Sequence, residues 1–219
     1  MKKTLLILIG LTSTSLFSEA QNTRFGFTGG VVFANYNSKM DGEKDNANSR
    51  IGITGGVVVD IPFGEHFSLQ PALNFVQKGT KDEQTFGGVT EKTSLNINCI
   101  EVPLNFLFNA SGNTGNFFIG AGPSFAFGIS GKVKYDDGTN SLTEDLKFGN
   151  SDDDHIKSLD LGANFISGYC FPNGLMLAVN YNRGLSNLLP GTAADNGTLK
   201  SNYFGIKLGF ILNNKNSNK

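Results

Sequence analysis

The clearest pattern in the chain is an alternation of apolar and polar residues that repeats every two positions. It is strongest in one nine-residue segment, where the apolar residues are Ile100, Val102, Leu104, Phe106 and Phe108. Glu101, Pro103 and Asn105 stand between them. A period of two is that of a β-strand whose two faces meet different surroundings. The segment therefore predicts a strand with one apolar face and one polar face.

Similar segments recur along the chain, and most exceed the about 5–6 residues of an ordinary strand. They predict strands at residues 24–36, 50–62, 67–80, 93–108, 116–131, 156–171, 175–187 and 200–213. A tilted membrane-spanning strand needs about 9–11 residues. The polar stretches 37–49, 81–92, 132–155 and 188–199 are expected as long loops, and they alternate with short connections, as in outer-membrane barrels. The fold class predicted is all-β, an eight-stranded antiparallel up-and-down transmembrane β-barrel.

The residue types on the two faces indicate which face meets lipid. The less apolar face is rich in glycine, alanine, serine and asparagine, whereas a water-facing exterior would carry many charges. We therefore expect the bulky apolar face to point outward, with Pro71 and Pro123 on it and Pro103 on the inner face. A sheet edge in hydrocarbon leaves backbone groups unpaired, so the sheet must close. Eight strands enclose an interior that side chains can fill, and we expect no open channel.

The N-terminal residues predict export. Lys2 and Lys3 precede an apolar run from Leu5 to Leu11, and Ser18-Glu19-Ala20 forms a small-x-small cleavage site. We expect a signal peptide at residues 1–20, an outer-membrane β-barrel at residues 21–213 and a polar C-terminal tail at residues 214–219. The expected location is the bacterial outer membrane after cleavage, with both termini in the periplasm.

Composition narrows the function classes. The 219 residues carry a formal net charge of −1 and no basic cluster, which argues against nucleic acid as a partner. Metal-ligand, phosphate-loop and dinucleotide motifs do not occur, so no cofactor is expected. Cys99 and Cys170 are expected as unpaired thiols, because the predicted arrangement places them on non-neighbouring strands.

Two neighbouring segments carry a resemblance to a known family. Residues 71–79 read Pro-Ala-Leu-Asn-Phe-Val-Gln-Lys-Gly, and residues 100–104 read Ile-Glu-Val-Pro-Leu. This pair resembles the PorT-type outer-membrane β-barrel family of Bacteroidota, as does the glycine-rich stretch 120–123. The motif residues are Pro71, Leu73, Lys78, Gly79, Glu101 and Pro103. The resemblance implies the barrel fold; some members of the family belong to a protein-secretion apparatus, and most are uncharacterised.

Four charged residues fall on the predicted inner face: Asp60, Glu101, Asp160 and Lys207, with Arg50 near one rim. Charges inside a filled barrel must be paired or hydrogen-bonded, because isolated ions are costly there. A lumen charge network of these residues has two interpretations, a gated plug or proton path and a structural network. The narrow interior favours the structural network.

The segment 132–155 is rich in carboxylates and ends at His155. It predicts a solvated acidic loop, with Ca²⁺ binding or recognition of a partner as alternatives. His66 and His155 are expected at opposite ends of the barrel. His155 has Ser151 and Ser158 nearby in sequence and Asp152 to Asp154 beside it. A Ser-His-acid constellation is recognised by its geometry, and the sequence shows none.

These patterns predict a small, non-enzymatic, monomeric outer-membrane protein with a structural or surface-interaction role. Outer-membrane lipids are its expected partners, together with envelope or secretion proteins at its loops and turns. The alternatives are a barrel component of a protein-secretion apparatus and a lipid-modifying outer-membrane enzyme.

Overall fold

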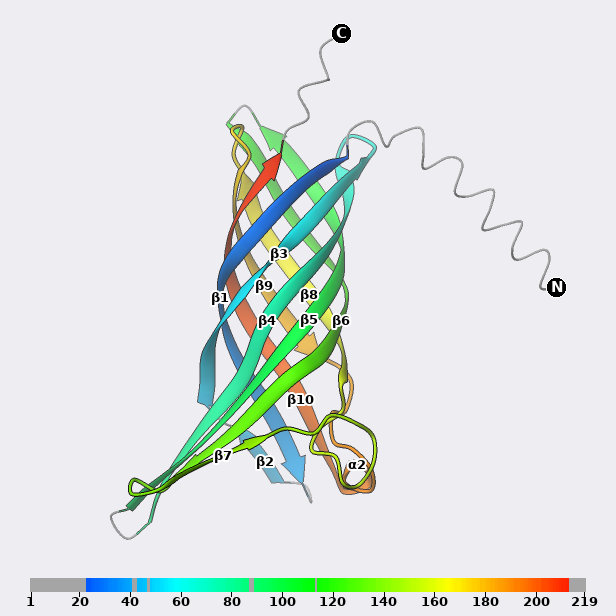
Figure 1. Ribbon diagram of the computed structural model, residues 1–219. Helices are drawn as coiled ribbons and strands as arrows, with labels where there is room; N and C mark the ends of the chain where they lie inside the picture. Colours follow the sequence, from blue (N-terminus) through cyan, green and yellow to red (C-terminus); the bar gives the residue numbers. More distant parts are fainter. Residues whose placement is uncertain (1–22, 41–42, 47, 87–88, 113, 213–219) are drawn as a thin grey trace, which may run out of the picture.

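A computed structural model describes residues 23–40, 43–46, 48–86, 89–112 and 114–212 (Figure 1). The predicted signal peptide and C-terminal tail lie outside these residues. The described residues form ten strands and one short helix. They are β1 (Arg24–Met40), β2 (Glu43–Asn46), β3 (Asn48–Phe63), β4 (Phe67–Phe86), β5 (Val89–Gly112), β6 (Gly115–Asp136), β7 (Ser141–Asp145), β8 (Leu159–Cys170), β9 (Leu175–Gly184), α2 (Ala193–Asn196) and β10 (Gly197–Leu212). Within this part of the chain, no helix is both long and apolar enough to cross a membrane.

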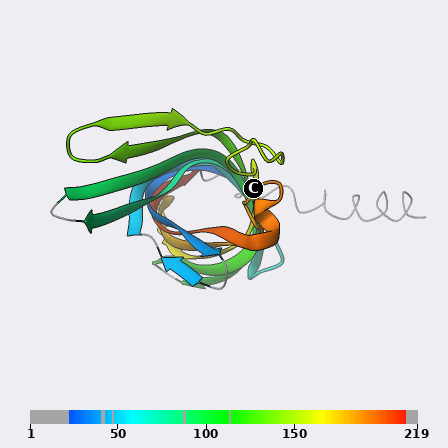
Figure 2. The same cartoon turned by 90° about the horizontal axis from the view of Figure 1, so that it is seen from below.

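Eight of the strands close into a ring, which Figure 2 shows from one end. Their order around the ring is β1, β3, β4, β5, β6, β8, β9 and β10. Each pairs antiparallel with its neighbours, and β10 returns to pair with β1 from Phe25 opposite Leu212 to Met40 opposite Gly197. The prediction of an all-β, eight-stranded, antiparallel up-and-down barrel is confirmed.

The strands are longer than the sequence pattern predicts. β4 and β5 continue as a hairpin through the polar stretch 81–92, until Phe86 lies opposite Val89. β6 continues to Asp136 and pairs with β7, and β1 continues to Met40 and pairs with β2. The expectation of loops across 37–49, 81–92 and the start of 132–155 is therefore wrong. A two-stranded ribbon in water exposes both faces, so neither face needs to be apolar. Its backbone pairing can therefore continue where the alternation of apolar and polar residues has ended.

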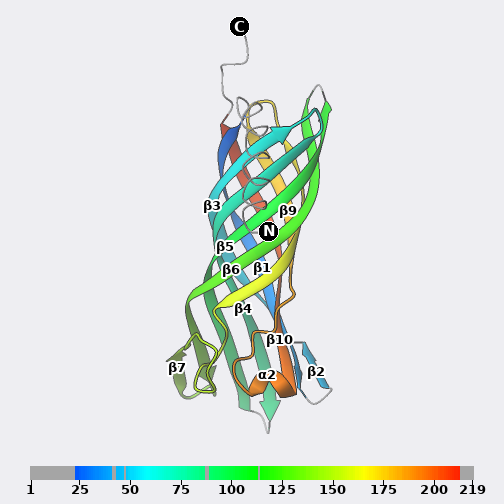
Figure 3. The same ribbon diagram turned by 90° about the vertical axis from the view of Figure 1, so that its right-hand side faces the viewer.

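The two ends of the barrel differ. At one end, called here the turn end, short connections join β3 to β4, β5 to β6 and β8 to β9, and both described chain ends lie there (Figure 1). Gly64 and Gly174 have φ values of 70° and 91° in two of these turns, a region that glycine adopts without strain. The opposite end, called the loop end, carries β2, β7, α2 and the extended hairpins (Figure 3).

The outer wall is apolar and the interior is mostly polar. Neighbouring residues of β4 illustrate the alternation, since Leu73 is 51% exposed and Asn74 is 2% exposed. In β9 buried and exposed residues alternate along the whole strand. Pro123 is exposed and Pro103 is buried, as their positions in the pattern predict. The predicted facing of the barrel is confirmed.

Candidate functional site

A buried ionic cluster crosses the interior of the barrel. Lys78 Nζ on β4 lies 2.9 Å from Asp160 Oδ2 on β8 and 3.4 Å from Glu101 Oε2 on β5. From β10, the Tyr203 hydroxyl donates a hydrogen bond of 2.5 Å to Glu101 Oε1, and the Ser201 hydroxyl donates one to Asp160. We call these five residues the ionic cluster. It links strands that lie far apart around the ring.

The cluster satisfies most of the demands that buried charge makes. The lysine faces two carboxylates, and two hydroxyl groups supply further donors to them. Lys78 Nζ also lies 5.4 Å from the centre of the Tyr203 ring, within the range of a cation–π contact. Because each charge has a partner, the cluster meets the requirement that permits ions in a barrel interior.

The structure distributes the four predicted lumen charges over different places. Glu101 and Asp160 belong to the ionic cluster. Asp60 lies at the turn end, where the Arg24 guanidinium forms an ion pair with it at 2.5 Å. Lys207 is buried opposite Gly30, and no ion pair joins it to any described residue. The expected residues therefore do not form one continuous network.

Lys78, which sequence reasoning placed only in the family motif, is the residue that joins the two carboxylates. Its position was readable from the pattern, since it shares inward parity with Asn74 four residues earlier. Arg50, expected near one rim, donates a hydrogen bond to the Asn96 side chain between β3 and β5. It takes no part in the ionic cluster.

The motif residues lie on two adjacent strands and have distinct structural roles. Pro71, Leu73, Lys78 and Gly79 are on β4, whereas Glu101 and Pro103 are on β5. Leu73 faces outward, Lys78 and Glu101 pair inside, and Pro103 is buried. A Cβ atom on Gly79 would overlap the Leu95 carbonyl oxygen, so this position requires glycine. The motif therefore holds one ion pair and one close strand contact.

Apolar layers lie on both sides of the polar interior. Toward the loop end, buried residues pack into one cluster: Tyr36, Ile97, Cys99, Ala126, Ile156 and Leu188. Toward the turn end, another cluster contains Val58, Leu107, Phe118, Ile166, Met176, Ala178 and Ile211. Between them, Asn164 donates to Asn105 at 2.8 Å and accepts from Asn180 at 2.9 Å. Both described cysteines are free, as predicted.

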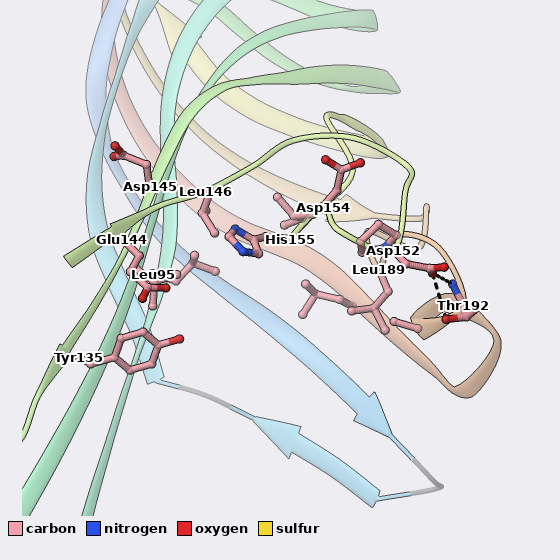
Figure 4. A pocket seen from close by; sticks show the side chains of 15 residues that line it. Leu95, Tyr135, Glu144, Asp145, Leu146, Asp152, Asp154, His155, Leu189 and Thr192 are labelled. Atoms are coloured by element: carbon pink, nitrogen blue, oxygen red, sulfur yellow. Dashed lines mark hydrogen bonds between the residues drawn. The ribbon is translucent and has the colours of Figure 1, made fainter. Parts of the chain in front are cut away.

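A cavity of about 450 Å³ opens at the loop end beside α2 (Figure 4). Its apolar lining comes from several elements: Leu95, Val133, Leu146, Ile156, Leu189, Pro190, Ala193 and Leu199. Four carboxylates also line it: Glu144, Asp145, Asp152 and Asp154. Tyr135, Thr192 and His155 complete the wall. The cavity combines an apolar surface with negative charge, and no lysine or arginine of the described chain lines it.

Hydrogen bonds between two loops hold one side of this cavity. Asp152 Oδ1 accepts from the Thr192 backbone N–H at 2.7 Å and from its hydroxyl at 3.0 Å. These two bonds lower the pKa of the Asp152 carboxyl, because they stabilise its charged form. Asp154 Oδ2 accepts from the Ser151 backbone N–H at 2.8 Å. Sequence reasoning singled out the acidic loop but had no signal for its contact with residue 192.

The histidines lie at opposite ends, as predicted. His66 stacks on Phe108 at the turn end, with ring centres 5.9 Å apart. His155 lies at the loop end, where its Nδ1 accepts the Lys147 backbone N–H at 3.1 Å. No group of three or more histidine, cysteine, aspartate or glutamate residues within the described ranges is arranged to hold a metal ion.

Comparisons with known proteins complete the description. Three solved structures align over most of the chain: Ail, the attachment invasion locus protein of Yersinia pestis (13% identity, 88% of this chain and 100% of that chain, TM-score 0.43), OprG from Pseudomonas aeruginosa (12%, 88% and 97%, 0.44) and Neisserial surface protein A (10%, 85% and 96%, 0.41). No curated protein sequence matches the chain. The family model described as outer membrane protein beta-barrel domain matches residues 19–189. The chain therefore belongs to the outer membrane protein beta-barrel domain family.

Proposed function

We propose that this outer-membrane protein is a closed barrel that acts by binding a partner at its loop end. The observation that carries the closed barrel is the ionic cluster, and the binding role rests on the loop-end cavity described below. Lys78 contacts carboxylates on β5 and β8, and hydroxyl groups from β10 reach the same carboxylates. A narrow eight-stranded interior filled in this way leaves little room for solute passage.

The two apolar layers support closure. The ionic cluster lies between an apolar cluster near the loop end and another near the turn end. An ion that crossed the barrel would have to displace apolar side chains twice and break buried ion pairs once. Each of these steps is costly, because apolar burial and ion pairing are both lost.

The outer wall supports a defined position in the membrane. Aromatic rings gather at the turn end, where Phe67 lies within 5.7 Å of both Phe106 and Phe108 between ring centres. Aromatic girdles flank the apolar band of outer-membrane barrels, whose short turns are periplasmic and whose long loops are extracellular. We therefore propose that the turn end faces the periplasm and that the loop end faces the outside of the cell.

The loop-end cavity supports a binding role. It has the size of a small-molecule or side-chain pocket, with an apolar wall and four carboxylates. The aromatic ring of Tyr135 offers a surface for a cation. We propose that the loop-end cavity binds a ligand with a positively charged group and an apolar part, such as an amine of a peptide or small molecule.

Planar-bilayer recording tests the closed barrel. Wild-type protein, with insertion verified by flotation of the same proteoliposomes and by a heat-dependent mobility shift, is expected to give no stable current steps. A variant that removes both carboxylates of the cluster, Glu101→Ala with Asp160→Ala, serves as the comparison for a loosened interior. Stable steps from the wild-type protein would contradict the proposal.

A ligand titration tests the binding role. Phenethylamine combines one cation with an aromatic body, and phenylethanol is its uncharged counterpart. The methyl resonance of Ile156, which lines the cavity, is expected to shift with the amine and much less with the alcohol. Asp154→Asn combined with Glu144→Gln should weaken the amine effect. Equal responses to amine and alcohol would show that charge has no role.

Two alternatives receive less support. The first is a role in a secretion apparatus. The PorT-type motif residues form the Lys78–Glu101 pair and pack the strands, so the motif supports the barrel fold. It gives no separate support for a role in secretion. A lipid-modifying activity would require a catalytic His155, whose Nδ1 is engaged with the Lys147 backbone. His155→Ala is expected to leave lipid A acylation unchanged.

A further inference from the structure

On three neighbouring strands the outward apolar residues end at one row. Phe33 on β1 lies opposite Phe204 on β10, and Phe204 lies opposite Tyr181 on β9. All three rings are exposed, at 37%, 42% and 40%. Aromatic girdles of this kind mark the border between the hydrocarbon of a membrane and its head groups. The row therefore locates that border on this side of the barrel, toward the loop end.

Cations follow immediately beyond the aromatic row. Arg183 stands two residues after Tyr181 on β9, and Lys200 stands four residues before Phe204 on β10, opposite Asn37. Lys39 lies two residues further along β1. Since a strand rises about 3.3 Å per residue, these side chains begin within roughly 7–20 Å of the row. Arg183 is nearest to the head-group layer, which is about 5–8 Å thick, and Lys200 and Lys39 follow on its water side.

The three cations share one cavity. A hollow of about 370 Å³ is lined by Asn37, Ser38, Lys39, Arg183, Gly184, Thr198, Lys200 and Asn202. Among the residues whose side chains the structure describes, no aspartate or glutamate lines it. Asn202 lines the same cavity and is only 7% exposed. The cavity thus has positive charge at its wall and a side-chain amide that can donate hydrogen bonds to an anion.

Three other loop-end lysines form ion pairs with carboxylates. Lys92 pairs with Glu83, Lys132 with Asp145 and Lys134 with Asp136, at 3.1–3.5 Å. Lys39, Arg183 and Lys200 form no ion pair with any residue whose side chain the structure describes, and the same holds for Lys81, Lys147 and Lys157. Lys39, Arg183 and Lys200 differ from these other lysines in lining one common cavity. Three unpaired cations from adjacent strands repel one another in the absence of an anion. A negatively charged ligand bound in their common cavity would remove this repulsion.

We infer that Lys39, Arg183 and Lys200, with Asn202, bind the phosphate of a lipid head group in the leaflet at the loop end. Arginine and lysine are the usual phosphate ligands, and arginine can donate two parallel hydrogen bonds to one phosphate. The Asn202 amide adds a donor at the base of the cavity. The aromatic row below it contacts the acyl chains of the same lipid. This inference concerns the outer wall and is independent of whether the barrel interior is closed.

Native mass spectrometry in dodecyl maltoside micelles tests the site, because this detergent contains no phosphate. The probe is dioleoyl phosphatidic acid, and dioleoylglycerol supplies the same acyl chains without phosphate. The triple variant Lys39→Gln, Arg183→Gln, Lys200→Gln removes the cations. Its matched control, Lys92→Gln, Lys132→Gln, Lys134→Gln, removes the same charge from the ion-paired lysines. The single variant Arg183→Gln is measured in parallel, and a heat-dependent mobility shift checks that every variant is folded.

Wild type and the matched control are expected to retain phosphatidic acid with an affinity at least about tenfold above that of the triple variant. Arg183→Gln should fall between them, and dioleoylglycerol should bind weakly to every variant. Equal retention by wild type and the triple variant would overturn the inference, as would an equal loss in the matched control. Glycerol phosphate that binds as tightly as phosphatidic acid would identify a site for soluble phosphate and overturn the assignment to a lipid.

Discussion

Lys78 Nζ lies 2.9 Å from Asp160 Oδ2, although 82 residues separate the two in the chain. Lys78 is on β4 and Asp160 is on β8, and β5 and β6 stand between these strands in the ring. The contact therefore runs across the interior rather than along the wall. It requires the sheet to curve so that β4 faces β8, and the stability of the ionic cluster therefore reports on the folded barrel.

Replacement of Lys78 by methionine is expected to destabilise the barrel strongly. Methionine keeps most of the side-chain volume but leaves Glu101 and Asp160 without their cation. The loss of one partner from a buried ion pair costs about 3–5 kcal/mol. Urea unfolding of the protein in lipid vesicles measures this change in the free energy of unfolding.

Lys132→Met is the matched control for this prediction. Lys132 pairs with Asp145 at 3.5 Å on the exposed hairpin, where an ion pair contributes about 0–1 kcal/mol. The control should therefore unfold nearly as the wild type does. Similar losses in both variants would indicate that the ionic cluster has no special role in the fold.

Tyr203→Phe tests the hydrogen bond at the other side of the cluster. The variant removes only the hydroxyl group that donates to Glu101 Oε1 at 2.5 Å. A hydrogen bond to a charged group contributes about 1.5–3 kcal/mol, and the same unfolding measurement should show this loss. Tyr135→Phe, at an exposed tyrosine of the loop end, is expected to leave stability unchanged. An unchanged Tyr203→Phe variant would mean that Glu101 finds another donor.

Gly122 is expected to tolerate no side chain. A Cβ atom there would overlap the Leu104 carbonyl oxygen on the adjacent strand. Gly122→Ala must therefore shift the backbone pairing of β5 and β6, which lowers the yield of folded protein in a refolding assay with a heat-dependent mobility shift. At Gly29 the added atom would meet the Thr54 carbonyl oxygen at an ordinary 3.8 Å. Gly29→Ala should refold as the wild type does, and failure of both variants would remove the steric explanation.

The contact between the two loops at the cavity should depend on pH. The pKa of Asp152 is lowered in the folded protein by the Thr192 backbone N–H and hydroxyl. Its contribution is therefore fully present above the ordinary aspartate pKa of about 3.9 and is lost as the pH falls through the lowered value. Hydrogen exchange of the Thr192 amide, corrected for its intrinsic pH dependence, should lose protection in that range.

Two variants control the pH experiment. Asp152→Asn removes the titrating group, so the pH-dependent loss of protection should disappear. Asp153→Asn changes the neighbouring carboxylate and should leave the wild-type profile intact. If the profile changed in Asp153→Asn and not in Asp152→Asn, the contact between Asp152 and Thr192 would not be the cause of the pH dependence.

The sequence pattern was sufficient to predict the closed barrel and the residues that face its interior. Alternation placed Glu101 and Asp160 inside because each lies between bulky apolar neighbours. It did not predict their partner, because the stagger of the strands decides which inward residues meet across the ring. Arg24 was missed for a related reason, since its pairing with Asp60 depends on how the first and third strands register at the turn end.

The loop end was predicted poorly, and the cause is physical. The alternation fades after Thr80, yet hydrogen bonding between β4 and β5 continues to Phe86, because exposed ribbons do not need an apolar face. The cavity depends on the contact of Asp152 with Thr192, between segments that follow different strands. A periodic pattern contains no information on such a contact.

The most direct test of the closed interior uses the two native cysteines. Both are free; Cys99 is buried within the loop-end apolar cluster, and Cys170 is half-buried at the turn end. A water-soluble maleimide is added to the folded protein in detergent, and labelled sites are identified by mass spectrometry. The account predicts that Cys170 is labelled and that Cys99 is labelled only after heat unfolding. Labelling of Cys99 in the folded protein at the rate of Cys170 would contradict it.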